Sequence, residues 1–164
     1  MDRFQLTNDL LTGIDTVDSQ HRMLFDLANQ IVDPSSERGA DAAFFASLAF
    51  LAEYVEFHFA SEELAMTQTD YPMRAGHVAA HLEFRELVGE FLERSLEEPS
   101  ITELRKRLTQ AVAGWLTDHI RVKDRALATH LRAHAGEVGF VLPDQEALIS
   151  AGYIQARTDW PKHQ

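Results

Sequence analysis

The sequence contains no cysteine, which excludes disulfide bonds, thiolate metal ligands and thiol nucleophiles. It also has no apolar run near the roughly 20 residues that a membrane-spanning helix needs. The first ten residues, MDRFQLTNDL, lack the long apolar core of a secretory signal. We therefore expect a cytoplasmic protein without a membrane segment.

Positive charge is scarce as well. The 15 Lys and Arg residues are outnumbered by 26 Asp and Glu, and the formal net charge is -11. Nucleic acids and anionic membranes bind basic surfaces, so an acidic chain without a basic stripe is a poor candidate for either partner. The 164 residues suffice for a domain with its own apolar core.

Glycine and proline are few, and they divide the chain into helical segments. Apolar residues recur at steps of three and four along these segments, and none of them shows the period-two alternation of a strand. The pattern predicts two helices over about Asp15–Val32 and Asp41–Thr67. A third is expected to begin at Tyr71-Pro72 and to reach Phe91. A fourth is expected to follow the capping box Ser100–Glu103 and to continue to Arg132. The expected fold is all-α: an antiparallel, up-down-up-down four-helix bundle.

The last part of the chain is less regular. We expect residues 1–135 to form the four-helix domain and residues 136–164 to form a C-terminal extension that packs on or near the bundle. Gly136 and Gly139 interrupt the helical pattern, and Pro143-Asp144-Gln145-Glu146 is suited to start a short helix that ends near Gly152.

Two pairs of polar residues occupy the apolar stripes of the second and third segments. His58 with Glu62, and His77 with His81, are four residues apart, so each pair projects from one helix face. Burying an unpaired carboxylate costs several kcal/mol, and a divalent cation would compensate for it. Imidazole and carboxylate ligands without sulfur suit iron, manganese or zinc.

The first and fourth segments add His21, His119 and Asp124 to this set. His119 and Asp124 are five residues apart, which corresponds to about 140 degrees around an ideal α-helix. Both can reach one centre only if the turn widens, so we expect a π-type irregularity near Ile120–Lys123.

Each of these residues also has a simpler interpretation. His21 alone could be a core histidine, and Glu62 with Glu63 could be an exposed acidic patch. A further pair with the same spacing, His130 and His134, is expected to be a solvated helix end. The joint occurrence of inward polar residues on four helices is what favours a metal site.

The motifs GIDTVDSQHRMLF, HFASEE, YPMRAGHVAAH and WLTDHIRVKD occur in this order. Together they resemble the bacterial hemerythrin family over about Leu11–Leu131. The resemblance implies dioxygen binding at a non-haem di-iron centre, with two iron ions and a bridging oxo or hydroxo group. The implied metal ligands are His21, His58, Glu62, His77, His81, His119 and Asp124. The long first connection around Pro34–Asp41 and the C-terminal tail depart from the minimal family pattern.

The resemblance also assigns roles to these residues. His77, His81 and His119 would hold the saturated iron, and His21 and His58 the iron with an open position. Glu62 and Asp124 would bridge the two. The walls of the oxygen pocket are expected to be apolar residues one turn from the ligands, although generic bundle packing explains them equally well: Leu24, Phe59, Trp115 and Leu116.

Three functions remain after this reading. The favoured one is a binding protein, not an enzyme, that binds dioxygen reversibly for carriage, storage or delivery. The alternative is an oxygen or redox sensor whose tail, Gly136–Gln164, docks a protein partner, although the tail could equally cover the bundle as a flap. A di-iron peroxide or nitric oxide reductase ranks third, because nothing in the ligand set supplies an extra acid.

Overall fold

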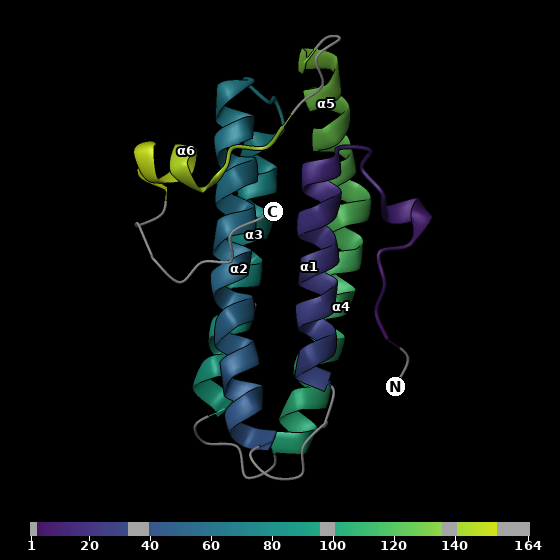
Figure 1. The fold of residues 1–164 in the computed structure, drawn as a ribbon, viewed down its shortest axis with the longest axis vertical. Coiled ribbons are helices and arrows are strands. Elements are labelled where there is room, and N and C mark those ends of the chain that lie inside the picture. The colour runs from purple at the N-terminus through teal and green to yellow at the C-terminus, as the bar shows by residue number, and fades with distance from the viewer. Residues whose placement is uncertain (1–2, 33–39, 96–100, 136–140, 154–164) are drawn as a thin grey trace.

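Four long helices run side by side in the computed structural model, which describes residues 3–32, 40–95, 101–135 and 141–153 (Figure 1). They are α1 (Asp15–Val32), α2 (Ala40–Gln68), α3 (Arg74–Ser95) and α4 (Ile101–His119). The fourth continues without a break through the π-helix η2 (Ile120–Asp124) into α5 (Arg125–Ala135). Two short elements flank the bundle: the 3-10 helix η1 (Asn8–Leu10) and the helix α6 (Gln145–Ser150).

The helix contacts define the topology. α1 packs against α2 and α4, and α3 packs against the same two helices. Helices consecutive in the chain are therefore neighbours in space, and the first is closed against the last (Figure 1). This confirms the all-α, up-down-up-down bundle, and the described residues contain no strand. In the described part of the chain, every helix is too short or too polar to cross a bilayer.

Most helix bounds agree with the prediction, but the start of α3 does not. Pro72 was expected in the first turn of the third helix, whereas it lies in a turn that precedes Arg74. Asp70 has a φ of 50° and the Tyr71 N–H donates to the Met66 carbonyl at 2.9 Å, so the end of α2 is closed by its own turn. The break at residues 33–39 and the capping residue Ser100 lie outside the described residues.

The entry into α1 is organised by Asp18. Its carboxylate accepts hydrogen bonds from the Thr12 N–H and hydroxyl, both at 2.8 Å, and from the Gly13 N–H at 3.2 Å. Gly13 has a φ of 78°, a conformation that glycine adopts without steric cost. These contacts fix the first turn of α1 and thereby the orientation of His21 one turn later.

The interior contains two apolar clusters separated by a polar layer. From Ile14 along α1, Ile14 and Val17 belong to one cluster and Leu24 and Phe25 to the other, with His21 between them. The remaining helices repeat this order. The cluster at the α5 end is completed by Ala65, Met66, Tyr71, Leu127, Ala128, Leu131 and Leu142. The larger cluster takes residues such as Phe44, Leu48, Leu51, Phe84, Val88, Leu104, Leu108 and Val112. The polar side chains of all four helices therefore lie at one level.

The described part of the tail lies against the bundle. α6 packs against α2, and Asp144 caps it by accepting a hydrogen bond from the Ala147 N–H at 2.9 Å. Leu148 is completely buried in the larger cluster, and Leu142 is buried in the other. The short helix thus forms where the sequence predicted it, while residues 136–140 and 154–164 of the expected docking tail lie outside the described residues.

We predict that replacement of Leu148 by alanine lowers the free energy of unfolding by about 2–5 kcal/mol, as for other buried leucines. Urea denaturation followed by circular dichroism measures this change. Val141→Ala is the control, because Val141 is 68% exposed and should change stability by less than about 0.5 kcal/mol. Equal effects of the two substitutions would show that α6 adds nothing to the fold.

Candidate metal centre

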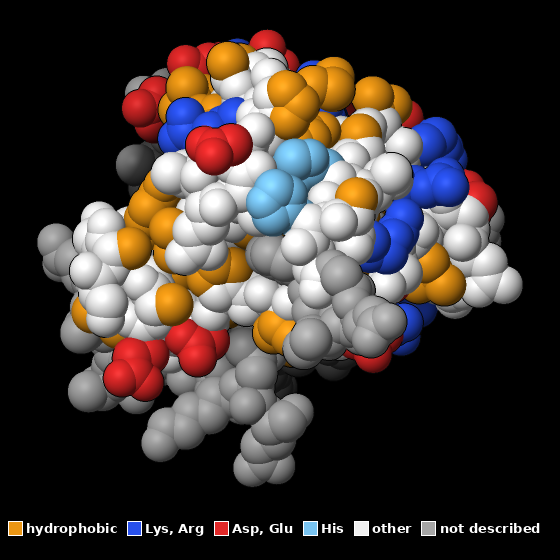
Figure 2. Space-filling view, turned by 90° about the horizontal axis from the view of Figure 1, so that it is seen from above, with side chains coloured by type: hydrophobic (Ala, Val, Ile, Leu, Met, Phe, Trp, Pro, Cys, Tyr) orange, Lys and Arg blue, Asp and Glu red, His pale blue; other side chains and the backbone are white. Residues whose placement is uncertain are grey.

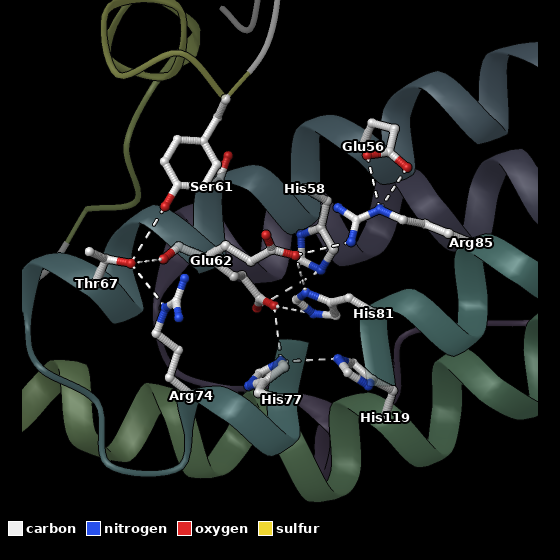
Figure 3. Close-up of polar contacts among 12 residues, drawn as sticks. Glu56, His58, Ser61, Glu62, Thr67, Arg74, His77, His81, Arg85 and His119 are labelled. Atoms are coloured by element: carbon white, nitrogen blue, oxygen red, sulfur yellow. Dashed lines mark hydrogen bonds and ion pairs between the residues drawn. The ribbon is translucent and has the colours of Figure 1, made fainter. Parts of the chain in front are cut away.

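The polar layer of the bundle contains all seven residues that the sequence singled out. They come from every long helix: His21 from α1, His58 and Glu62 from α2, His77 and His81 from α3, His119 from the end of α4, and Asp124 from η2. Each is buried, with at most 5% of its surface exposed. Figure 3 shows the labelled candidate ligand side chains from α2, α3 and α4 converging on one region.

These side chains form two groups of potential metal ligands that share one member. The first group contains Glu62, His77, His81 and His119, and the second contains His21, His58, Glu62 and Asp124. Within each group, one ligand atom per residue lies within 4.8 Å of all the others. Three histidines therefore face one point and two histidines face a neighbouring point.

Glu62 directs its two oxygens toward different groups. Its Oε2 lies 3.3 Å from the Nε2 of His77 and 3.3 Å from the Nε2 of His81. Its Oε1 is turned toward His58, whose Nε2 is 3.9 Å away. A carboxylate in this position can bind one ion through each oxygen.

Asp124 has the same arrangement from the opposite side of the layer. Its Oδ1 lies 3.1 Å from His77 Nε2 and 3.0 Å from His119 Nε2, whereas its Oδ2 lies 3.0 Å from His21 Nε2. Both carboxylates therefore stand between the two histidine groups.

The π-helix makes the contribution of Asp124 possible. In η2 the turn is widened over Ile120–Asp124, so residues five apart come to the same side of the helix. His119 and Asp124 consequently meet at 3.0 Å. The predicted irregularity near Ile120–Lys123 is confirmed, and its cause is the five-residue spacing of two side chains that face one centre.

Two buried carboxylates side by side need positive charge. Burial and the charge of Asp124 raise the pKa of Glu62, but His58 and the other imidazoles lower it further, to a net value well below the usual range. Burial lowers the pKa of His58 to about 4. Burial also acts against the charged form of His77, but the nearby carboxylates of Asp124 and Glu62 together outweigh burial and raise its pKa to about 9. In the metal-free protein, a proton on His77 supplies part of the positive charge that a metal cation would provide.

Several polar atoms of the layer have no hydrogen-bond partner in the described structure. They include the Nε2 atoms of His21, His58 and His81 and all four oxygens of Glu62 and Asp124. Buried polar atoms are rarely left without partners, and each such case costs free energy. His21 Nε2 and Asp124 Oδ2 are only 3.0 Å apart and still unaligned for a hydrogen bond, which fits two atoms aimed at a common cation.

The outer faces of two histidines are held by residues that the sequence reasoning missed. The Nδ1 of His58 lies 2.8 Å from Gln20 Oε1, and the Nδ1 of His81 lies 3.0 Å from Glu63 Oε1. Such contacts fix the orientation of an imidazole so that its Nε2 faces the ion. The sequence signal for both residues was their position, because Gln20 directly precedes His21 and Glu63 directly follows Glu62. Glu63 is mostly buried, so it does not belong to an exposed acidic patch.

The four expected wall residues lie close to the ligands. The Phe59 ring stacks on His81 with 3.8 Å between centroids, and the Trp115 ring stacks on His119 at 4.2 Å. Both aromatic rings thus contact the group of three histidines. Leu24 and Leu116 are buried and follow or precede a ligand by one helical turn.

The second histidine pair is only in part the solvated helix end that was expected. His134 is exposed, but His130 is half-buried and its Nε2 lies 3.0 Å from the Thr69 carbonyl oxygen. Its ring also lies 5.0 Å from that of Tyr71. The prediction was wrong for His130 because α5 passes over the α2–α3 turn. Figure 2, which views this end of the molecule, shows histidine side chains at the surface.

A family model described as the hemerythrin HHE cation binding domain matches residues 12–131. The chain belongs to the hemerythrin family. It is 34% identical over 133 residues to a bacteriohemerythrin of Stenotrophomonas maltophilia. The aligned region covers 79% of this chain and 82% of that relative. It is 30% identical over 123 residues to a bacteriohemerythrin of Methylococcus capsulatus, which covers 74% and 91%. No solved structure gave a significant match.

The hemerythrin match contains the whole polar layer and ends before α6. The resemblance noted from the motifs is therefore confirmed, and the chain is a non-haem iron-binding domain by family. The residues fit such a metal, because two buried groups of nitrogen and oxygen atoms converge without sulfur, and several of these atoms, including all four carboxylate oxygens, have no hydrogen-bond partner.

We predict that Asp124→Asn lowers the iron content of the hemerythrin domain. The amide preserves the shape but removes one of the two negative charges and one of its two oxygen ligands. Loss of a ligand that faces both groups should weaken binding by at least the 10–100-fold typical of outer partners. Iron per chain, measured after anaerobic loading and gel filtration, reports the effect. Asp118→Asn is the control, because Asp118 is an exposed carboxylate on the same continuous helix, six residues before Asp124; equal iron contents would contradict the assignment.

Proposed function

We propose that this protein binds dioxygen reversibly at a di-iron centre. His77, His81 and His119 would hold one iron, His21 and His58 the other, and Glu62 and Asp124 would bridge them. The observation that carries the proposal is the position of the two carboxylates, each of which presents one oxygen to each histidine group. When bound, a pair of ferrous ions supplies the electrons that dioxygen takes up and returns.

The unequal numbers of histidines support a specific position for dioxygen. The group that contains His77, His81 and His119 has one more nitrogen donor than the group that contains His21 and His58. If Glu62 and Asp124 served both ions, the iron held by the second group would keep a coordination position for a small molecule.

Apolar side chains would keep this position dry. Leu24 and Leu116 are 1% and 4% exposed and belong to the larger apolar cluster. A dry pocket excludes water and protons that would promote irreversible oxidation of iron. Because these walls offer no acid to protonate a reduced product, we favour a binding protein over a peroxide or nitric oxide reductase.

Oxygen or redox sensing is the second candidate, and one observation favours it. α6 packs against α2, the helix that carries His58 and Glu62. A change in ligand position at the centre could therefore reach the tail through one helix. Carriage stays the first proposal, since Leu142 and Leu148 of the described tail are buried against the bundle.

We predict a reversible colour change. Iron-loaded protein, reduced without air, should gain a charge-transfer absorption band on exposure to dioxygen and lose it when dioxygen is removed. Zinc-loaded protein is the control, because zinc has no redox chemistry and should stay colourless. A rapid, irreversible oxidation would reject carriage and favour sensing or turnover.

We also predict that Leu116→Thr accelerates the irreversible loss of this band several-fold. The hydroxyl and the smaller volume would admit water to the dry side of the pocket. The rate is followed optically in air-saturated buffer. Leu82→Thr is the matched control, since Leu82 is 52% exposed on the surface of α3. An unchanged rate in Leu116→Thr would remove this residue from the pocket wall.

A further inference from the structure

The histidines of the metal centre differ in what holds their outer nitrogen. His81 Nδ1 faces the carboxylate of Glu63 at 3.0 Å, whereas His58 Nδ1 faces the neutral amide of Gln20 at 2.8 Å. The Nδ1 atoms of His21 and His77 are buried and have no hydrogen-bond partner in the described structure. The two histidine groups therefore differ in their surroundings. A carboxylate faces the outer nitrogen of a histidine in one group, and a neutral amide does so in the other.

Glu63 is held in place from its solvent side by Arg85. Arg85 Nη1 lies 3.2 Å from Glu63 Oε1, and Arg85 Nε lies 2.9 Å and 3.0 Å from the two oxygens of Glu56. The guanidinium also lies 5.2 Å above the Phe59 ring, which stacks on His81. Figure 3 shows Arg85 directed toward Glu56, beside His58 and His81. The carboxylate is thus clamped between a surface ion pair and a buried imidazole.

An ordinary surface salt bridge does not explain this arrangement. The Arg85–Glu56 pair is partly exposed and contributes little by itself. Glu63, however, is only 13% exposed and shares one oxygen between Arg85 and a fully buried ring. Partial burial of this carboxylate beside the histidine costs free energy. We attribute that cost to its function, which is to hold and polarise the buried ring.

A carboxylate that accepts the Nδ1–H of a metal ligand changes the ligand electronically. It draws the proton outward, so the imidazole gains negative character and donates more strongly through Nε2. Added negative charge favours a trivalent ion over a divalent one by Coulomb's law. The effect acts on the ion that His81 binds, and an amide such as that of Gln20 has no comparable charge.

We propose that Glu63, clamped by Arg85, is a positioning residue that selectively stabilises the ferric state of the iron held by His77, His81 and His119. The two irons are then electronically unequal, and the one without the open position is the more easily oxidised. This inference rests on the di-iron centre of the proposed function. It does not require that dioxygen binding be reversible.

The test is the reduction potential of iron-loaded protein, measured by optical titration with mediators under nitrogen. Glu63→Gln keeps an acceptor oxygen for His81 but removes the charge. We expect the ferric-to-ferrous ratio at a fixed potential to fall about tenfold, which equals a positive shift of about 59 mV for a one-electron couple. Glu86→Gln, an exposed carboxylate next to Arg85 in α3, makes the same charge change and should leave the potential unaltered. Equal potentials in the two variants overturn the proposal.

A second variant applies the same principle to the other histidine group. Gln20→Glu places a carboxylate against His58 Nδ1 and should shift the potential in the negative direction. If Glu63→Gln fails to retain iron, this variant decides the proposal alone: a negative shift supports it, and no shift or a positive one overturns it. Wild-type protein that takes up no iron pair would overturn the proposed function as well. If wild-type protein binds two irons but is oxidised irreversibly, only the proposal of reversible oxygen carriage is rejected.

Discussion

The structure depends on two negative charges buried at the centre of a helix bundle. Glu62 and Asp124 are at most 1% exposed and lie among five histidines. A pair of carboxylates cannot remain ionised there without compensating positive charge, which protons supply when metal is absent and a cation supplies when it is present. The interior is therefore built around charge compensation, with apolar packing above and below it. The polar layer divides the core into two apolar clusters.

The backbone has adjusted to this demand where regular geometry fails. An α-helix would turn Asp124 away from His119, and the five-residue π-helix removes that conflict at the cost of a less favourable hydrogen-bond pattern. The entry to α1 shows the same priority. Asp18 and Gly13 form a local network that fixes the start of the helix one turn before His21. Irregular backbone is thus concentrated where a ligand must be aimed.

The bundle and the inward-facing residues could be predicted because both follow from spacing along single helices. His58 with Glu62 and His77 with His81 are four apart, and the five-residue step to Asp124 indicated the π-helix. Contacts between helices could not be predicted in this way. Arg85 reaches Glu63 across the α2–α3 interface, and His130 meets Thr69 only because α5 passes the α2–α3 turn. The position of Pro72 outside α3 depended on how α2 closes, which a periodic pattern does not encode.

In the proposed di-iron centre the two ions would be unlike, because only one of them would have an open position for dioxygen. The ligand numbers create that difference in part, with three histidines against two. The outer contacts act in the same direction, since Glu63 adds a negative charge beside His81 while Gln20 adds none beside His58. α2 carries both His58 and Glu63, on successive turns of one rigid element. The asymmetry of the centre is therefore a property of the helix geometry itself, and any substitution that moves α2 changes both sides together.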